Sequence, residues 1–397
     1  ISMLTGENGI LRRAREAKEE NERAQTEEQS RLSNYEENIS NYIGVDWDLA
    51  KKNAVKHQNQ RNSKAIAIGT DGKTVNMDLW EYTKLEDGTY GLNDAESLTD
   101  EGTKTTGYIG NIINGKIEGT VPKYIKDEND SDFFEVTNMA YSFFNNKELE
   151  EAPEIPDGVT NIRALFNSCD NLTKIHNLPR SAINMYGTFA NCKSLEKAPE
   201  IPENVENMHG TFFGCTGIEE PPIIPGSVVN MSNTFSGCTN MRECPNIPIG
   251  VTDMSNTFYG CSSIRECPSI PNGVTNMSST FYRCSNILEG PQIPNTVIEM
   301  YATFYECTNL IKAPVIPESV SILCVTFKGC TRLQGEIEIN ASVTGKDLGK
   351  EWFNNIDYGN CFLNACTEDG LELKVTGTCT VIDRIVENAN NPNITVK

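Results

Sequence analysis

The hydrophobic and polar positions of this chain repeat every 23 residues between about residues 136 and 333. In one repeat the apolar residues Val274, Met277, Phe281, Cys284 and Ile287 follow steps of three, four, three and three residues, the spacing of one helical face. Prolines then follow, and proline excludes helix and favours extended backbone. The pattern therefore predicts a short helical segment and then a short strand in each repeat.

Two columns of identical residues mark the repeat. The phenylalanines stand at Phe143, Phe166, Phe189, Phe212, Phe235, Phe258, Phe281, Phe304 and Phe327. Three residues after each of them, from the second onward, comes Cys169, Cys192, Cys215, Cys238, Cys261, Cys284, Cys307 or Cys330. We expect both columns to be buried, with the cysteines acting as small hydrophobes that keep free thiols. The better disulfide candidates are Cys244, Cys267, Cys361, Cys366 and Cys379.

The repeats predict a stacked architecture. One repeat buries too little apolar surface to offset the ordering of its backbone, whereas stacking buries both flanks of every repeat. The expected fold is an α/β solenoid, a right-handed stack of about nine 23-residue coils over residues 134–333. Each coil is expected to hold a short helical segment and a short parallel strand.

The flanking segments carry different signals. Residues 1–40 are rich in charged residues and end in apolar residues at helical spacing, so they predict a helix or stalk. Residues 41–133 hold the hairpin-type turns Asp71-Gly72, Asp87-Gly88 and Asn114-Gly115, and predict a small β-rich capping domain. The acidic stretch 127–132 is interpreted as a solvated linker. Residues 334–397 form the expected C-terminal cap, with one degenerate coil near residues 360–375.

The residues of one repeat carry a family resemblance. The stretch 251–264, Val-Thr-Asp-Met-Ser-Asn-Thr-Phe-Tyr-Gly-Cys-Ser-Ser-Ile, with the Ile-Pro that follows in each coil, resembles the leucine-rich repeats of BspA-like bacterial cell-surface proteins. The strand part departs from the plainer family pattern because it reads L-x-x-A-P-x-I-P. The resemblance implies a curved leucine-rich-repeat solenoid at the cell surface, with adhesion to protein or glycan ligands.

A second, shorter resemblance concerns the beginning of the chain. Residues 3–18, which end in Arg12-Arg-Ala-Arg-Glu-Ala-Lys18, resemble the stretch after the hydrophobic segment of prepilin-like surface proteins of Gram-positive bacteria. This resemblance implies an extracellular protein attached to the membrane or cell wall only through a segment upstream of Ile1. A solvated helical spacer is the alternative interpretation.

Composition narrows the classes of partner and chemistry. With 34 Lys+Arg against 55 Asp+Glu, the formal net charge is −21, which argues against nucleic acid because phosphates are bound by an excess of basic residues. Three histidines and the absence of any C-x-x-C pair argue against a metal site. We expect no cofactor and assign no catalytic residue.

Two groups of side chains are candidate ligand-binding residues. Four carboxylates recur at one position of successive coils and should form a stripe: Glu220, Glu243, Glu266 and Glu289. Such a stripe would suit a cation, a basic peptide or a sugar, although Arg242 and Arg265 next to it could neutralise it. Aromatic residues directly after the repeat phenylalanines form a row, Tyr259, Tyr282 and Tyr305, which suits glycan stacking or a protein contact but is also explained by packing between coils.

These features favour a non-catalytic cell-surface interaction protein. The alternatives are a carbohydrate-active solenoid enzyme that uses two glutamates of the stripe as acid and base, and a structural spacer of a surface appendage. Equivalent glutamates provide no asymmetry to separate two pKa values, which argues against the enzyme.

Overall fold

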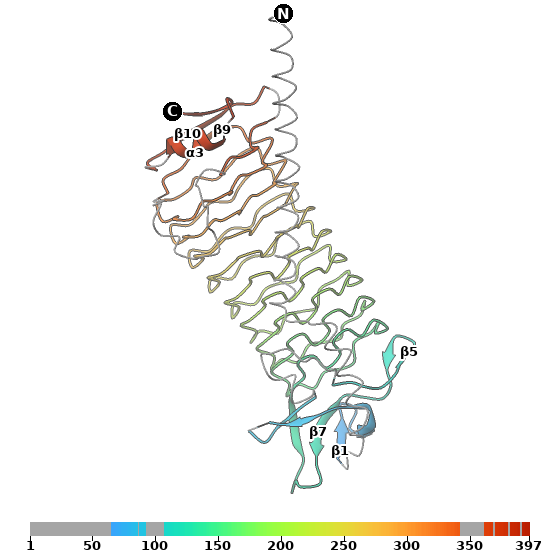
Figure 1. Cartoon of the computed structure of the whole chain (residues 1–397). Coiled ribbons are helices and arrows are strands. Elements are labelled where there is room, and N and C mark those ends of the chain that lie inside the picture. The colour runs from blue at the N-terminus through green and yellow to red at the C-terminus, as the bar shows by residue number, and fades with distance from the viewer. Residues whose placement is uncertain are drawn as a thin grey trace, which may run out of the picture. The chain divides into compact units, whose positions relative to one another are not determined.

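The computed structural model describes residues 65–85, 87–92, 107–341, 361–367, 370–379, 382–389 and 391–397, all within one compact unit. The predicted N-terminal helix and the prepilin-like stretch lie outside these residues. The elements are β1 (Ile66–Gly69), β2 (Thr74–Val75), η2 (Met77–Leu79), β3 (Thr83–Lys84), β4 (Tyr90–Gly91), β5 (Ile112–Ile113), β6 (Lys116–Ile117), β7 (Pro122–Lys126), β8 (Phe134–Asn138), β9 (Gly335–Glu338), β10 (Leu373–Thr376), α3 (Ile382–Ala389) and β11 (Ile394–Val396) (Figure 1).

A six-stranded sheet of order β2-β1-β7-β8-β4-β3 precedes the repeats. Each of the three turn motifs joins an antiparallel pair: Asp71-Gly72 lies between β1 and β2, Asp87-Gly88 between β3 and β4, and Asn114-Gly115 between β5 and β6. In the turn between β5 and β6, Asn114 and Gly115 both have positive φ, 51° and 76°, as a two-residue hairpin turn of type I′ requires. A Cβ on Gly115 would also lie 2.7 Å from the Cβ of Glu150, so only glycine fits there.

The interpretation of residues 127–132 as a solvated linker is wrong at Asp130. This stretch turns the chain from β7 to β8, and the Asp130 side chain is only 3% exposed. Its carboxylate pairs with the Lys84 ammonium and accepts a hydrogen bond from the Tyr90 hydroxyl. These two partners, Lys84 foremost, lower the pKa of Asp130 to about 2. The turn therefore joins β3, β4 and the β7–β8 connection.

The predicted helical segments are absent from the described coils, which consist of turns and isolated bridges. In every coil the residues two before and two after the repeat phenylalanine have positive φ; around Phe258 these are Asn256, at 54°, and Gly260, at 70°. A left-handed residue every four positions breaks any right-handed helix. The apolar spacing of three and four residues therefore arises from successive tight turns that point every third or fourth side chain inward.

The backbone amides of these turns are satisfied alternately within and between coils. The amides of Met254 and Phe258 donate to carbonyls of the next coil at 2.9 and 3.0 Å. The amides of Thr257 and Cys261 donate three residues back within their own coil, at 3.1 and 3.0 Å. Because half of the donors reach the neighbouring coil, the turns gain their stability from stacking, as expected for a solenoid.

The predicted phenylalanine column is continuous and buried. Neighbouring rings are stacked with centroids 5.4–5.9 Å apart and planes within 13°. Trp80 and Tyr108 close the N-terminal end against Phe143, at 5.8 and 5.7 Å. At the other end Phe362 extends the stack, which places the degenerate coil where the sequence predicts it.

Buried threonines and cysteines tie the coils together. The Thr257 hydroxyl lies within hydrogen-bond distance of the carbonyls of Met231, one coil back, at 3.0 Å, and Met254, at 2.8 Å. The Cys261 thiol donates to the Phe235 carbonyl at 3.0 Å, and the other repeat cysteines do the same. All fourteen cysteines are free, including the five disulfide candidates. Burial raises the pKa of the repeat thiols, to about 12 at Cys169 and Cys215, so they stay protonated donors.

The predicted strand of each coil is reduced to single parallel bridges. One series joins the residues five positions before each phenylalanine, which are asparagines in most coils, as in Asn184 to Asn207, and another joins pairs such as Lys197 to Glu220. Asparagine suits its position because its Oδ1 accepts the amide two residues on, as Asn207 does from His209 at 3.0 Å. Regular strands return in the C-terminal cap, where β9, β10 and β11 form a parallel sheet beside α3.

Replacing Val325 by asparagine is expected to raise the free energy of unfolding by about 1 kcal/mol, because Val325 is a β-branched residue with φ of 49° and asparagine tolerates that conformation. The reverse change at an equivalent position, Asn233→Val at φ of 57°, should lower it by a similar amount. Urea denaturation of both variants measures the two shifts. Equal stability of Val325→Asn and the unaltered protein would contradict the assignment of strain to this position.

Candidate functional site

The four glutamates predicted to form a stripe occupy one position of four successive coils, and all four are exposed. We call Glu220, Glu243, Glu266 and Glu289 the acidic stripe. Parallel bridges join its ends to the next coils, Lys197 to Glu220 and Glu289 to Lys312. Lysines therefore bound the stripe on both sides, and the negative charge is confined to four coils.

The sequence left open whether Arg242 and Arg265 neutralise the stripe. Among the described residues, neither arginine forms an ion pair with a glutamate of the stripe. Arg242 pairs with Glu219, outside the stripe, at 3.0 Å. Within the stripe Glu289 pairs with Lys312 at 3.4 Å, whereas in the part of the chain that the structure describes no cation lies within ion-pair distance of Glu220, Glu243 or Glu266. A column of prolines lies two residues further along each coil, and Pro222, Pro268 and Pro291 of this column are partly exposed. The stripe is thus a solvent-facing acidic surface beside a stiff apolar edge.

The tyrosine row, Tyr259, Tyr282 and Tyr305, is a packed stack. Its ring centroids lie 4.5 Å apart, and the planes are within 9°. Tyr282 and Tyr305 are only 7% and 4% exposed, and the Lys328 ammonium lies 5.0 Å from the centre of the Tyr305 ring. Neighbouring tyrosines therefore cover the facing sides of the three rings, and Lys328 lies against the Tyr305 ring. The row and the stripe occupy different columns, separated along each coil by buried cysteine and isoleucine or leucine positions.

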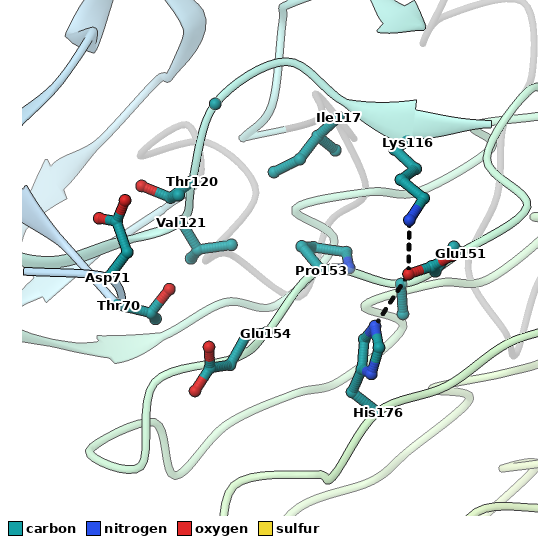
Figure 2. A pocket seen from close by; sticks show the side chains of 12 residues that line it. Thr70, Asp71, Lys116, Ile117, Thr120, Val121, Glu151, Pro153, Glu154 and His176 are labelled. Carbon is teal, nitrogen blue, oxygen red and sulfur yellow. Dashed lines mark hydrogen bonds and ion pairs between the residues drawn. The ribbon is translucent and has the colours of Figure 1, made fainter. Parts of the chain in front are cut away.

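A pocket of about 210 Å³ lies where the N-terminal sheet meets the first two coils, and we call it the junction pocket. Figure 2 shows Asp71 and Glu154 on one side of it and Lys116, Glu151 and His176 on the other. The apolar side chains of Ile117, Val121 and Pro153 lie between the two charged ends.

Glu151 organises the basic end of the junction pocket. Its carboxylate lies 2.8 Å from the Lys116 ammonium, 3.2 Å from Nε2 of His176 and 3.7 Å from the Lys174 ammonium. The hydrogen bond from Lys116, followed by that from His176, lowers the pKa of Glu151. The hairpin turn fixes this contact, because the carbonyl of Gly115 accepts the amides of Glu150 and Glu151 at 2.8 and 3.1 Å.

A β-bulge and a glycine shape the acidic end. The register of β1 against β7 shifts between Ile68 and Gly69, and such bulges redirect the side chains that follow them. A Cβ on Gly69 would lie 2.3 Å from the Thr120 hydroxyl and 3.1 Å from Oδ1 of Asp71, so the missing side chain lets these two groups approach. The amide of Lys73 donates to Asp71 at 3.0 Å and is the foremost cause of the lowered pKa of Asp71.

The described residues offer little for metal or acid–base chemistry. Among them no group of three or more His, Cys, Asp or Glu side chains is arranged to hold a metal ion. Within the same residues no helix is long and apolar enough to cross a membrane. All four glutamates of the stripe are exposed, so none has the buried, apolar surroundings that distinguish a catalytic acid from its partner base.

A family comparison decides what kind of repeat this is. The family model described as "BspA type Leucine rich repeat region (6 copies)" matches residues 137–265 and 232–360, together more than half of the chain. The chain belongs to the BspA type leucine-rich repeat family. In this BspA type protein, therefore, the stacked turns, phenylalanine column and isolated bridges are the form that the family's repeat takes.

Three solved leucine-rich repeat structures are similar to the BspA type chain at low sequence identity. Comparison with curated proteins returns no match. A leucine-rich repeat protein from Bacteroides ovatus is 17% identical with a TM-score of 0.46, covering 79% of this chain and 80% of that one. A leucine-rich repeat protein of T. pallidum is 17% identical, TM-score 0.34, covering 65% and 90%. A leucine rich cell surface protein from Faecalibacterium prausnitzii is 15% identical, TM-score 0.34, covering 80% and 93%.

The junction pocket of this BspA type protein was missed by sequence reasoning. Asp71 and Lys116 come from the N-terminal sheet, and only the fold brings them to Glu151 and Glu154 of the first coil. One signal was present in the sequence: His176 stands where every other coil except the last has proline. That exception places an imidazole on Glu151.

Proposed function

We propose that this BspA type leucine-rich repeat protein is a non-catalytic interaction protein of the bacterial cell surface, and that its acidic stripe binds a protein or glycan ligand. The observation that carries the proposal is the exposure of four aligned carboxylates, three of which have no described cation within ion-pair distance. Like charges at neighbouring coils repel each other, and a partner with basic groups relieves that repulsion. Membership of the BspA type family supports a role in binding rather than catalysis.

The tyrosine row has a smaller part in this proposal. Because the rings stack on one another and the Tyr305 hydroxyl is buried, the row mainly supports the shape of the coils. The ligand is therefore expected to be chosen mainly by charge and to bind more weakly at high salt.

The double charge reversal Glu243→Lys with Glu266→Lys is expected to weaken ligand binding by about ten-fold or more, because it turns the centre of the stripe positive. The measurement is binding to arrays of immobilised glycans and extracellular-matrix proteins at low and high salt. The matched control is Glu203→Lys with Glu318→Lys, an equal change of charge at two exposed positions of another column.

Two outcomes would count against this proposal. Equal loss of binding in the control pair would mean that net charge, and not the stripe, determines binding. If the unaltered protein binds no array component saturably, the chain is better described as a structural spacer.

A further inference from the structure

The junction pocket has opposite charges at its two ends and an apolar middle. At the acidic end Asp71 and Glu154 face the pocket beside the hydroxyl-bearing Thr70 and Thr120 (Figure 2). The cation nearest to Asp71 among the described residues is Lys73, at 3.2 Å, and its side chain is 82% exposed. An exposed pair of this kind is weak, so Asp71 can exchange this partner for a ligand.

The other end of the pocket carries a surplus of positive charge. Lys116 and Lys174 both lie near the single carboxylate of Glu151, and His176 adds a ring nitrogen on the same carboxylate. The Lys116 ammonium has three donors, of which the contact with Glu151 uses one. The remaining donors can bind a second acceptor that enters the pocket.

We propose that the junction pocket binds a zwitterion: a small molecule or peptide with an ammonium group and a carboxylate separated by a short apolar body. The ammonium binds between Asp71 and Glu154 and donates to the nearby threonine hydroxyls. The carboxylate accepts from Lys116, and the apolar body packs on Ile117, Val121 and Pro153. This site shares no residue with the acidic stripe, so a negative result for one proposal does not count against the other.

The position of the pocket supports its interpretation as a ligand-binding site. Small-ligand sites occur preferentially where two structural units meet, and this one lies between the N-terminal sheet and the first coils. Three departures from regular structure form it: the bulge after Ile68, the bare Cα of Gly69 and the histidine in place of a repeat proline.

The test is calorimetry and ligand-detected NMR on the full chain with ω-amino acids of increasing length, from glycine to 6-aminohexanoate, and with the dipeptide Ala-Ala. We expect saturable binding with an optimum in the series. The N-acetyl and methyl-ester derivatives of the best probe should each bind about ten-fold more weakly, because each removes one charge. Preference for an ω-amino acid indicates a free small molecule, and preference for Ala-Ala indicates a peptide.

Variants locate the site. Glu154→Gln and Lys116→Gln should each weaken binding about ten-fold, whereas Glu200→Gln, an exposed glutamate at the equivalent position two coils further on, should leave it unchanged. The proposal is overturned if no probe binds saturably, if the capped derivatives bind as well as the zwitterion, or if Glu154→Gln and Lys116→Gln bind normally. Because the capped probes are tested on the unaltered protein, a variant that fails to fold does not block the test.

Discussion

Replacing Phe258 by alanine is expected to lower the free energy of unfolding by about 3–5 kcal/mol, the usual cost of removing a fully buried phenylalanine. The Phe258 ring is stacked between Phe235 and Phe281, with centroids 5.9 and 5.7 Å away, so its loss leaves a cavity between two coils. The neighbouring coils cannot close this cavity freely, because the amide of Phe258 and the thiol of Cys284 fix their spacing. Urea denaturation followed by circular dichroism measures the change.

The control for this substitution is Phe213→Ala. Phe213 directly follows a repeat phenylalanine and is partly exposed, so the same chemical change should cost less than half as much. If both variants lose the same stability, the phenylalanine column does not hold the special place in the core that its geometry indicates.

Replacing Trp80 by alanine is also expected to lower the free energy of unfolding by about 3–5 kcal/mol, and this substitution acts at one end of the phenylalanine stack. Trp80 is 3% exposed and contacts both Phe143, at 5.8 Å, and Tyr108, at 5.1 Å. Its removal opens the first coil to water, and a terminal coil with an exposed flank unfolds first in a solenoid. Limited proteolysis should therefore cut the variant first near residues 107–150, and denaturant unfolding should lose cooperativity.

Trp80→Phe separates packing from the indole N–H. The Nε1 of Trp80 is buried without a hydrogen-bond partner in the described structure, so its loss removes an unsatisfied donor. The phenylalanine variant should keep most of the stability and the original protease pattern. A loss as large as that of the alanine variant would show that the cap depends on the size of the indole and not on an aromatic contact.

The repeat and its buried columns could be predicted from the sequence because a fixed period within one chain is direct evidence of equivalent environments. The local backbone could not, since steps of three and four residues suit a helix and a series of tight turns equally well. A distinguishing signal was present two residues before and after the phenylalanine in the middle coils, where glycine or asparagine recurs, as at Gly210, Gly214, Asn233 and Gly237. These residue types mark positive φ, and all four adopt it.

The candidate sites also differ in how far the sequence alone could predict them. The acidic stripe could be predicted because its glutamates share one repeat position. The covering of the tyrosine ring faces could not be read from sequence, because it depends on the 4.5 Å spacing of neighbouring rings. The junction pocket depends on contacts between residues far apart in the chain, such as Lys116 with His176 through Glu151, which no period reveals.

The internal coils are nearly interchangeable, because each is held by the same phenylalanine stacking, threonine hydroxyl and cysteine thiol contacts. The contact of Trp80 with Phe143 ends the stack on one side, and the sheet of β9, β10 and β11 ends it on the other. Recombination between repeats in the gene could therefore remove or duplicate one 23-residue unit and leave both terminal structures intact. The number of carboxylates in the stripe would change with it. Related strains could thus vary the length of the surface they present by unequal crossing-over alone, with no new point mutation.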